Sequence, residues 1–176
     1  MPAVSLDVLP SGADVFLDAN ILVYALLNQS AQCRTLLRRC AIEDIVGVTS
    51  LHIVNEVTHR LMLAEAVKTG IIGRARATDL AARPEKIKRL STYWVQVQST
   101  LNMNLVILVP DEDWLHTAHR ARVECGLLTN DSLIVAAARH YGLSSLASAD
   151  AAFDLVPGLV RYAPADLTTP TASASQ

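Results

Sequence analysis

The sequence predicts a single α/β domain whose central, mostly parallel sheet is flanked by helices. The chain has 176 residues, a length that fits one domain with a substantial core. Hydrophobic residues make up 51% of it, which excludes an intrinsically disordered protein. Short apolar and β-branched runs alternate with segments of helical periodicity, and this alternation is typical of parallel β-α-β units.

Composition sets the two ends of the chain apart from this domain. Residues 1–13 contain Pro, Gly and Ser, so we expect this lead-in to contribute little to the core. Residues 164–176 are rich in Ala, Ser, Thr and Pro, which favours a disordered tail. The folded domain is therefore expected to span residues 14–163.

In the first half of the domain, each predicted strand is followed by helical sequence. Strands are expected at residues 14–17 and 45–49, and helices at residues 21–27, 32–41 and 51–67. Apolar residues recur at i, i+3, i+4 and i+7 from Cys33, which predicts the second of these helices. Thr49 and Ser50 can cap the third helix, and Gly70 and Gly73 end it.

The second half continues the same alternation. Strands are expected at residues 105–109, 143–147 and 159–162, and helices at residues 84–101, 111–125 and 131–141. Pro84 suits the first turn of the long amphipathic helix. The uninterrupted apolar run before Pro110 suits a strand that is covered on both faces. Gly126 and Gly142 end the last two helices.

Several features bear on where the protein resides. No apolar run approaches the roughly 20 residues of a membrane-spanning helix, so we expect no membrane association. The N-terminus lacks a basic region followed by an apolar one, so no secretory signal is expected. Cys33, Cys40 and Cys125 are widely spaced, which indicates reduced structural thiols. These features together predict a cytoplasmic protein.

Charge is distributed unevenly along the chain. The net charge of −2 argues against a uniformly basic nucleic-acid binder. Residues 60–89 nevertheless carry 8 Lys or Arg against 3 Asp or Glu. This segment could bind a polyanion, with Arg83, Lys86 and Arg89 as its best candidates, or dock a protein partner. It could equally be a solvated helix face.

Four acidic residues occupy comparable places in the predicted topology. Asp18 ends the first strand, and Glu56 lies in the second turn of the helix after the second strand. Asp131 opens a helix, and Asp150 follows the strand at residues 143–147. Parallel strands gather their carboxyl ends at one edge of the sheet, so the four carboxylates are expected to converge there. Because they would repel one another, a hard divalent cation, Mg²⁺ or Mn²⁺, is the expected remedy.

At these acidic positions the chain resembles the PIN-domain nucleases, and particularly the VapC-type toxins of bacterial toxin–antitoxin modules. The resemblance runs from about Asp14 to Tyr162. It is carried by the segments Phe16-Leu17-Asp18-Ala19-Asn20-Ile21-Leu22, Asn55-Glu56-Val57, Asn130-Asp131-Ser132-Leu133-Ile134-Val135-Ala136-Ala137-Ala138 and Ser148-Ala149-Asp150-Ala151-Ala152-Phe153. The order and spacing of the four segments are more specific than any one of them.

The resemblance implies a PIN-like domain that hydrolyses RNA phosphodiester bonds with Mg²⁺ or Mn²⁺. The family's catalytic and metal-holding acids fall on Asp18, Glu56, Asp131 and Asp150, and its supporting polar residues on Asn20 and Ser148. Ser148 stands where the family usually has Thr and keeps the hydroxyl, whereas Ala19 replaces a frequent Thr or Ser. The region at residues 70–102 looks longer than in compact members of the family.

The toxin branch of the family implies particular partners. RNA is the expected substrate on the strength of the resemblance alone, since the four acids would cut either nucleic acid. Arg83, Lys86 and Arg89 are then the candidate RNA-binding residues. A ribonuclease toxin implies a small antitoxin protein that blocks or distorts the acidic pocket, and we also expect a homodimer.

Three alternatives compete with this interpretation. His52, Glu56 and His59 share a helix face and could suggest zinc, although no companion Cys or His has a suitable spacing. An aspartyl-phosphate enzyme would need a strand-end Lys, and no Lys follows Lys88. A PIN-like binding or scaffold protein with a degenerate pocket, without catalysis, remains the main alternative, and calorimetry of divalent-metal binding would separate it from a nuclease.

Overall fold

A six-stranded parallel sheet forms the centre of the computed structural model, which describes residues 3–167. Every pair of neighbouring strands is parallel, which confirms the predicted fold class. In spatial order the strands are β1 (Val4–Ser5), β6 (Val160–Ala163), β5 (Ser145–Ala147), β2 (Asp14–Leu17), β3 (Val46–Ser50) and β4 (Val106–Leu108). β2 therefore lies inside the sheet, between β5 and β3.

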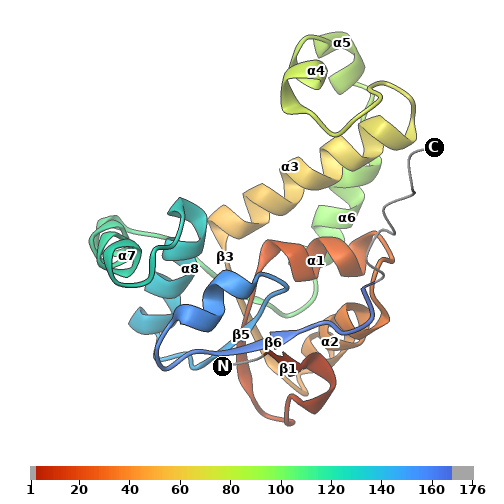
Figure 1. Cartoon of the computed structure of the whole chain (residues 1–176). Coiled ribbons are helices and arrows are strands. Elements are labelled where there is room, and N and C mark those ends of the chain that lie inside the picture. The colour runs from red at the N-terminus through yellow and green to blue at the C-terminus, as the bar shows by residue number, and fades with distance from the viewer. Residues whose placement is uncertain (1–2, 168–176) are drawn as a thin grey trace, which may run out of the picture.

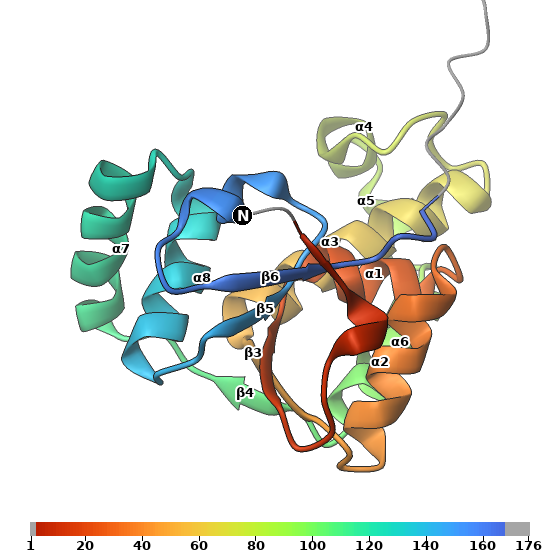
Figure 2. The same ribbon diagram turned by 60° about the horizontal axis from the view of Figure 1, so that its bottom comes forward.

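Helices flank the sheet on both sides, as predicted. They are α1 (Ala19–Leu26), α2 (Ala31–Ala41), α3 (Leu51–Lys68), α4 (Ala77–Ala81), α5 (Pro84–Ile87), α6 (Thr92–Leu101), α7 (Glu112–Cys125) and α8 (Thr129–His140), with the 3-10 helices η1 (Leu6–Val8) and η2 (Ala151–Leu155). α7 and α8 lie on one side of the sheet, and α1, α2 and α6 on the other (Figure 2). No helix of residues 3–167 is long and apolar enough to cross a membrane.

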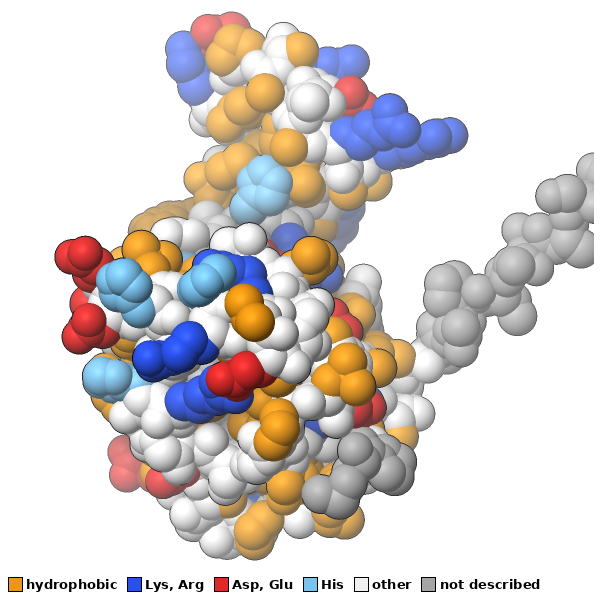
Figure 3. Space-filling view, turned by 60° about the vertical axis from the view of Figure 1, so that its left-hand side comes forward, with side chains coloured by type: hydrophobic (Ala, Val, Ile, Leu, Met, Phe, Trp, Pro, Cys, Tyr) orange, Lys and Arg blue, Asp and Glu red, His pale blue; other side chains and the backbone are white. Residues whose placement is uncertain are grey.

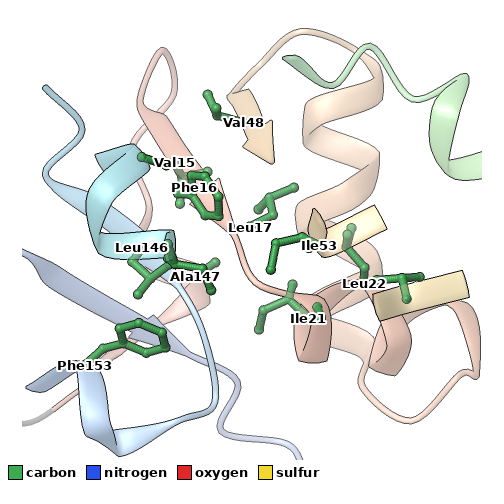
Figure 4. Packing of buried hydrophobic residues seen from close by; sticks show 14 of the residues in the cluster. Val15, Phe16, Leu17, Ile21, Leu22, Val48, Ile53, Leu146, Ala147 and Phe153 are labelled. Atoms are coloured by element: carbon green, nitrogen blue, oxygen red, sulfur yellow. The ribbon is translucent and has the colours of Figure 1, made fainter. Parts of the chain in front are cut away.

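The core is built around β2. Val15, Phe16 and Leu17 have no exposed surface, because both neighbouring strands and both helical layers cover them. Leu146 of β5 and Phe153 of η2 pack into the same core (Figure 4). Burying such side chains contributes about 1.5–3 kcal/mol each, which holds the end of β2 in a fixed position.

The N-terminal segment belongs to the core, contrary to our expectation. β1 pairs with β6, with Val4 opposite Tyr162. Leu6 and Leu9 are both only 3% exposed and join the main hydrophobic cluster. The expectation that residues 1–13 contribute little to the core is therefore wrong, because a strand of two residues is too short to produce a periodic sequence pattern.

The start of the predicted tail is held against α2. The Asp166 carboxylate accepts hydrogen bonds from the Ser30 hydroxyl at 2.6 Å and from the backbone amides of Ala31 at 2.6 Å and Gln32 at 3.0 Å. Asp166 thus satisfies amides at the N-terminus of α2, which otherwise lack partners within the helix. Residues 168–176, for which we predict disorder, lie outside the described residues.

Residues 70–91 form a small projection at the end of α3, which we call the basic lobe (Figure 1). The single helix predicted at residues 84–101 is wrong, because α5 and α6 are separate helices. The Glu65 carboxylate accepts hydrogen bonds from three backbone amides at the start of α6, those of Ser91, Thr92 and Tyr93, at 2.8–3.1 Å. A second hydrophobic cluster joins the basic lobe to α3 through Leu63, Ala66, Ile72, Leu80 and Leu90.

β4 is also less covered than expected. It is the last strand of the sheet, and the Val106 side chain at its start is 46% exposed. The expectation of a strand covered on both faces is therefore wrong. A continuous apolar run fits an edge strand as well as a central one when one of its faces packs on the core, so the run alone does not place the strand within the sheet.

The close packing of β3 against α2 yields a stability prediction. A Cβ atom on Gly47 would lie 2.7 Å from Cys40 Sγ and 2.7 Å from Leu105 Cδ2. Gly47→Ala should therefore lower the free energy of unfolding by about 1–3 kcal/mol, as overpacked cores do. Gly73→Ala is the matched control, because a Cβ there meets nothing within 4 Å. Urea denaturation measures both, and equal midpoints for the two variants would contradict the prediction.

Candidate active site

A cleft of about 710 Å³ opens where the chain leaves the carboxyl ends of the strands. All four predicted acids line it, although they come from α1, α3, α8 and η2 or the residues just before them. The lining residues are Asp18, Asn20, Tyr24, Glu56, Arg60, Leu128, Thr129, Asn130, Asp131, Ile134, Ala149 and Asp150. The parallel sheet therefore gathers residues that lie more than 130 positions apart in the sequence.

Asp18 stands at the junction of β2 and α1. It is the N-cap residue of α1, and its Oδ1 accepts a hydrogen bond from the Ala19 amide at 2.6 Å. Its own backbone amide donates to the Ala147 carbonyl of β5 at 3.1 Å. Asp18 is only 8% exposed, so its carboxylate is fixed at the floor of the cleft.

Ser148 and Asn20 hold the second oxygen of this carboxylate. The Ser148 hydroxyl donates to Asp18 Oδ2 at 2.6 Å, and the Asn20 amide donates to the same oxygen. Asn20 Oδ1 accepts from the Ala149 backbone amide at 3.0 Å, and Ser148 Oγ accepts from the Asp150 amide at 3.0 Å. The two polar residues thus link the end of β2 to the end of β5 and orient Asp18.

Burial raises the pKa of the Asp18 carboxyl from 3.8 to about 6. Hydrogen bonds from the Ser148 hydroxyl and the Ala19 amide oppose this rise, and the negative charges of Glu56 and Asp131 add to it. The pKa of Asp131 is also raised, mainly by burial and then by the charges of Asp150 and Glu56. The carboxylates therefore repel one another across the cleft, as expected for acids that gather without a cation.

Asp131 and Asp150 stand at the starts of two helices, α8 and the 3-10 helix η2. Asp131 lies in the first turn of α8, which begins at Thr129, earlier than predicted, with Leu128 as its N-cap. Asp150 is the N-cap residue of η2, and its Oδ1 accepts from the Ala152 amide at 2.8 Å. Both residues therefore line the cleft from the start of a helix.

Glu56 reaches the cleft from the second turn of α3. Its Oε2 accepts a hydrogen bond from the Asn130 side chain at 3.2 Å, which links α3 to α8. Its Oε1 lies 3.7 Å from Arg60 Nη1, one helical turn further along α3. Glu56 is therefore positioned from both sides rather than pointing freely into solvent.

Sequence reasoning missed three of the residues around the acids. Arg60 and Tyr24 line the cleft, and Arg161 donates from Nη1 to the Ser148 carbonyl at 3.3 Å while it pairs with Asp154. A signal existed only for Arg60, because a residue four positions after Glu56 on a predicted helix shares its face. Arg161 acts across separate elements, which no local spacing indicates.

The cleft fits a hard divalent cation by the chemistry of its donors. Its acids offer carboxylate oxygens, the ligands that Mg²⁺ and Mn²⁺ prefer, and the charges of Glu56 and Asp131 add to the burial that raises the pKa of Asp18. Within residues 3–167, however, no three His, Cys, Asp or Glu side chains lie close enough together to form a finished metal site. The acidic side chains would therefore have to move inward around an ion.

The alternative zinc site is not formed in the part of the chain that the structure describes. His52 Nδ1 lies 2.8 Å from the Ser50 hydroxyl, and burial lowers the pKa of this imidazole. Its buried Nε2 has no hydrogen-bond partner among the described residues. His59 is exposed on the surface of α3. Ser50 is the N-cap residue of α3, in agreement with the prediction, but its side chain makes no capping hydrogen bond to the helix.

The predicted basic residues do not reach the acids. Arg83, Lys86 and Arg89 lie in the basic lobe, where Lys and Arg side chains stand out from the surface (Figure 3). The lobe follows Lys68, which lies 12 positions after Glu56 on α3, and the helix rises about 18 Å over that length. Arg83 also has a structural contact, because its Nη1 donates to the Ile71 carbonyl.

The sequence and the fold together define the family. Residues 15–159, most of the chain, match the PIN domain family model, so the chain belongs to the PIN domain family. This agrees with an all-parallel sheet that brings four acids to one cleft. No curated protein matches the sequence.

Two solved structures are similar to this chain. One is VapBC2 from Rickettsia felis, bound to a DNA fragment from its promoter, with 18% identity and a TM-score of 0.56 over 86% of this chain and 98% of that chain. The other is a toxin–antitoxin complex from Klebsiella pneumoniae, with 20% identity and a TM-score of 0.53 over 83% of this chain and 95% of that chain. At such identities the likeness shows a shared fold.

The raised pKa of Asp18 predicts a pH-dependent effect of Asp18→Asn in EDTA. A folded-state pKa of about 6 against 3.8 means that the folded protein binds the proton more tightly, so this group's stabilising contribution is lost as pH rises through that window. Relative to wild type, Asp18→Asn should therefore gain up to roughly 3 kcal/mol of unfolding free energy between pH 4 and pH 7.5.

Urea denaturation at several pH values measures the unfolding free energy of the variant relative to wild type. The hydrogen bonds lost in the variant shift this quantity by a constant, so its change with pH reports on the Asp18 carboxyl alone. Asp79→Asn controls for removing one exposed carboxylate, in the first turn of α4. A difference between Asp18→Asn and wild type that stays constant with pH would show that Asp18 is not desolvated as described.

Proposed function

We propose that this protein is a Mg²⁺- or Mn²⁺-dependent ribonuclease. The observation that carries the proposal is the convergence of Asp18, Glu56, Asp131 and Asp150 on one cleft, together with the buried hydrogen bond from Ser148 to Asp18. Membership of the PIN domain family supports the same chemistry. RNA as the substrate rests on the resemblance to VapC-type toxins.

In this proposal each residue has a distinct task. Asp18, Asp131 and Asp150 hold the cation, and Glu56 either completes the set of ligands or orients the attacking water. Ser148 and Asn20 act on Asp18, which they keep in one rotamer by sharing its Oδ2. Asn130 acts in the same way on Glu56 through its hydrogen bond at 3.2 Å.

A bound Mg²⁺ or Mn²⁺ supplies a hydroxide-like nucleophile at neutral pH and neutralises charge that grows on the phosphate. The protein's own contribution is to bring four carboxylates to one cleft and to bury one of them. Burial, with a smaller contribution from the charges of Glu56 and Asp131, raises the pKa of Asp18, and a cation held there would offset both effects. No side chain of the chain needs to form a covalent intermediate.

We infer further that the protein is the toxin of a type II toxin–antitoxin pair. The two similar structures are both of toxin–antitoxin complexes, which supports a small antitoxin protein as partner. An antitoxin that covers the cleft would keep the ribonuclease inactive. The homodimer and the cytoplasmic location remain predictions, and co-expression with the gene product of a small neighbouring reading frame would test the partner.

The ribonuclease proposal predicts the loss of cleavage in Asp18→Asn. The substitution removes the central carboxylate at nearly constant volume, so purified protein should keep its circular dichroism spectrum and lose metal-dependent cleavage of single-stranded RNA. Asp113→Asn, which removes an exposed carboxylate from the first turn of α7, should cut like wild type. Cleavage by Asp18→Asn at the wild-type rate would remove Asp18 from the mechanism.

Calorimetry of Mn²⁺ binding to the wild-type protein separates a nuclease from a scaffold with a degenerate pocket. Binding of the cation to the folded state should also raise the thermal midpoint above its value in EDTA. If Mn²⁺ neither binds nor shifts the thermal midpoint, the four acids do not form a metal site, and a scaffold protein without catalysis is favoured over a nuclease.

The basic lobe gives a further prediction for RNA binding. Lys86 and Arg89 are exposed, so they are free to contact phosphates that flank the cleavage site. Lys86→Gln/Arg89→Gln should weaken RNA binding and flatten its salt dependence by about 0.7 per lost contact to a single strand. Arg83→Gln is made separately, because its contact with Ile71 gives it a second, structural effect. Unchanged affinity and salt slope in the double variant would assign the lobe to protein contacts instead.

A further inference from the structure

One basic side chain stands among the acids of the cleft. Of the described residues that line it, Arg60 alone is Lys or Arg, whereas Asp18, Glu56, Asp131 and Asp150 are acidic. Its side chain is 38% exposed, so it is open to a ligand in the cleft. The predicted catalytic set has no role for a cation at this position.

The contact between Arg60 and Glu56 leaves the guanidinium available. Arg60 Nη1 lies 3.7 Å from Glu56 Oε1, beyond hydrogen-bonding distance, and both side chains are about a third exposed. Exposed i,i+4 pairs of this kind contribute little to stability. Glu56 also has Asn130 as a hydrogen-bond donor on its other oxygen. The pair therefore orients Arg60 toward the acids without saturating it.

The carboxylates of an acidic cleft repel the phosphates of a polyanionic substrate. A cation held by the acids can neutralise the phosphate that reacts, but the phosphates on either side still face carboxylates. The basic lobe begins beyond Lys68, about 12 Å further along α3 than Arg60, so it cannot serve the nearest phosphate. A guanidinium presents a planar fork of donors that matches a phosphate and is always charged.

We propose that Arg60 binds the backbone phosphate next to the scissile bond of the RNA, a role that rests on the proposed ribonuclease function. When RNA enters, the guanidinium exchanges its loose contact with Glu56 for a phosphate. Because this phosphate does not react, Arg60 stabilises the bound substrate and the transition state alike. It thereby sets the affinity and the register of the strand in the cleft rather than the rate of the chemical step.

Equilibrium binding to an Asp18→Asn background tests this, since that protein should hold RNA without cutting it. Added to this background, Arg60→Gln should weaken the binding of a single-stranded oligoribonucleotide about tenfold and flatten the salt slope by about 0.7. Arg60→Lys keeps the positive charge but lacks the planar guanidinium, so its RNA affinity should fall between those of the unchanged Arg60 protein and Arg60→Gln. Arg120→Gln, which removes an exposed Arg of α7 outside the cleft, should change neither quantity.

Cleavage kinetics in the wild-type background provide the second readout. Arg60→Gln should raise KM by a similar factor and change kcat by less than about twofold, as loss of uniform binding predicts. Circular dichroism and the thermal midpoint verify that each variant is folded. If Arg60→Gln does not fold, Arg60→Lys serves as the test variant.

Each outcome decides between the inference and the function on which it rests. If wild type cuts RNA while Arg60→Gln leaves Kd, salt slope and KM unchanged, the role of Arg60 is wrong and the ribonuclease stands. If kcat falls and Kd is unchanged, Arg60 acts on the reacting phosphate or through Glu56, which also overturns the inference. If wild type does not cut but the Arg60 effects on binding appear, the inference stands as RNA binding and the catalytic proposal fails. If wild type neither cuts RNA nor binds it at any salt concentration, both fail.

Discussion

The rest of the site depends on a buried carboxylate at the end of a central strand. Asp18 is 8% exposed, and its two oxygens are held by the Ala19 amide, Ser148 and Asn20. These bonds join the end of β2 to the end of β5, which are neighbours in the sheet. Because Val15, Phe16 and Leu17 of β2 are completely buried, the position of Asp18 is determined by the packing of the whole core rather than by a surface loop.

This arrangement costs stability in the free protein. Burial and the charges of Glu56 and Asp131 both raise the pKa of Asp18, so ionisation of this carboxyl is less favourable in the folded protein than in an exposed side chain. The hydrogen bonds from Ser148 and Ala19 offset part of that effect and orient the carboxylate at the same time. Functional sites commonly carry such a cost, because their residues are selected for activity rather than for stability.

α3 connects the two charged regions of the molecule. Glu56 and Arg60 lie within its first ten residues at the cleft, and the basic lobe is joined to its last six residues through a hydrophobic cluster of its own. The helix keeps these regions at a set separation, since the residues between them are regularly hydrogen-bonded. A strand of RNA could then meet Arg60 first and the lobe further out, and the two contacts can be tested separately.

Local sequence determined the elements and the kind of chemistry, because strand runs, helix periodicity and the four acidic positions are properties of short segments. From these alone, the parallel α/β fold and the gathering of Asp18, Glu56, Asp131 and Asp150 could be predicted. Only the tertiary structure decided that β1 joins the sheet, that β4 is an edge strand and that Arg83 braces the basic lobe. It also decided that Asn130 and Arg60 flank Glu56 and that Arg161 holds Ser148. Except for the i,i+4 pair of Glu56 and Arg60, whose spacing could have indicated it, these contacts join elements that are distant in sequence, and local spacing carries no information on them.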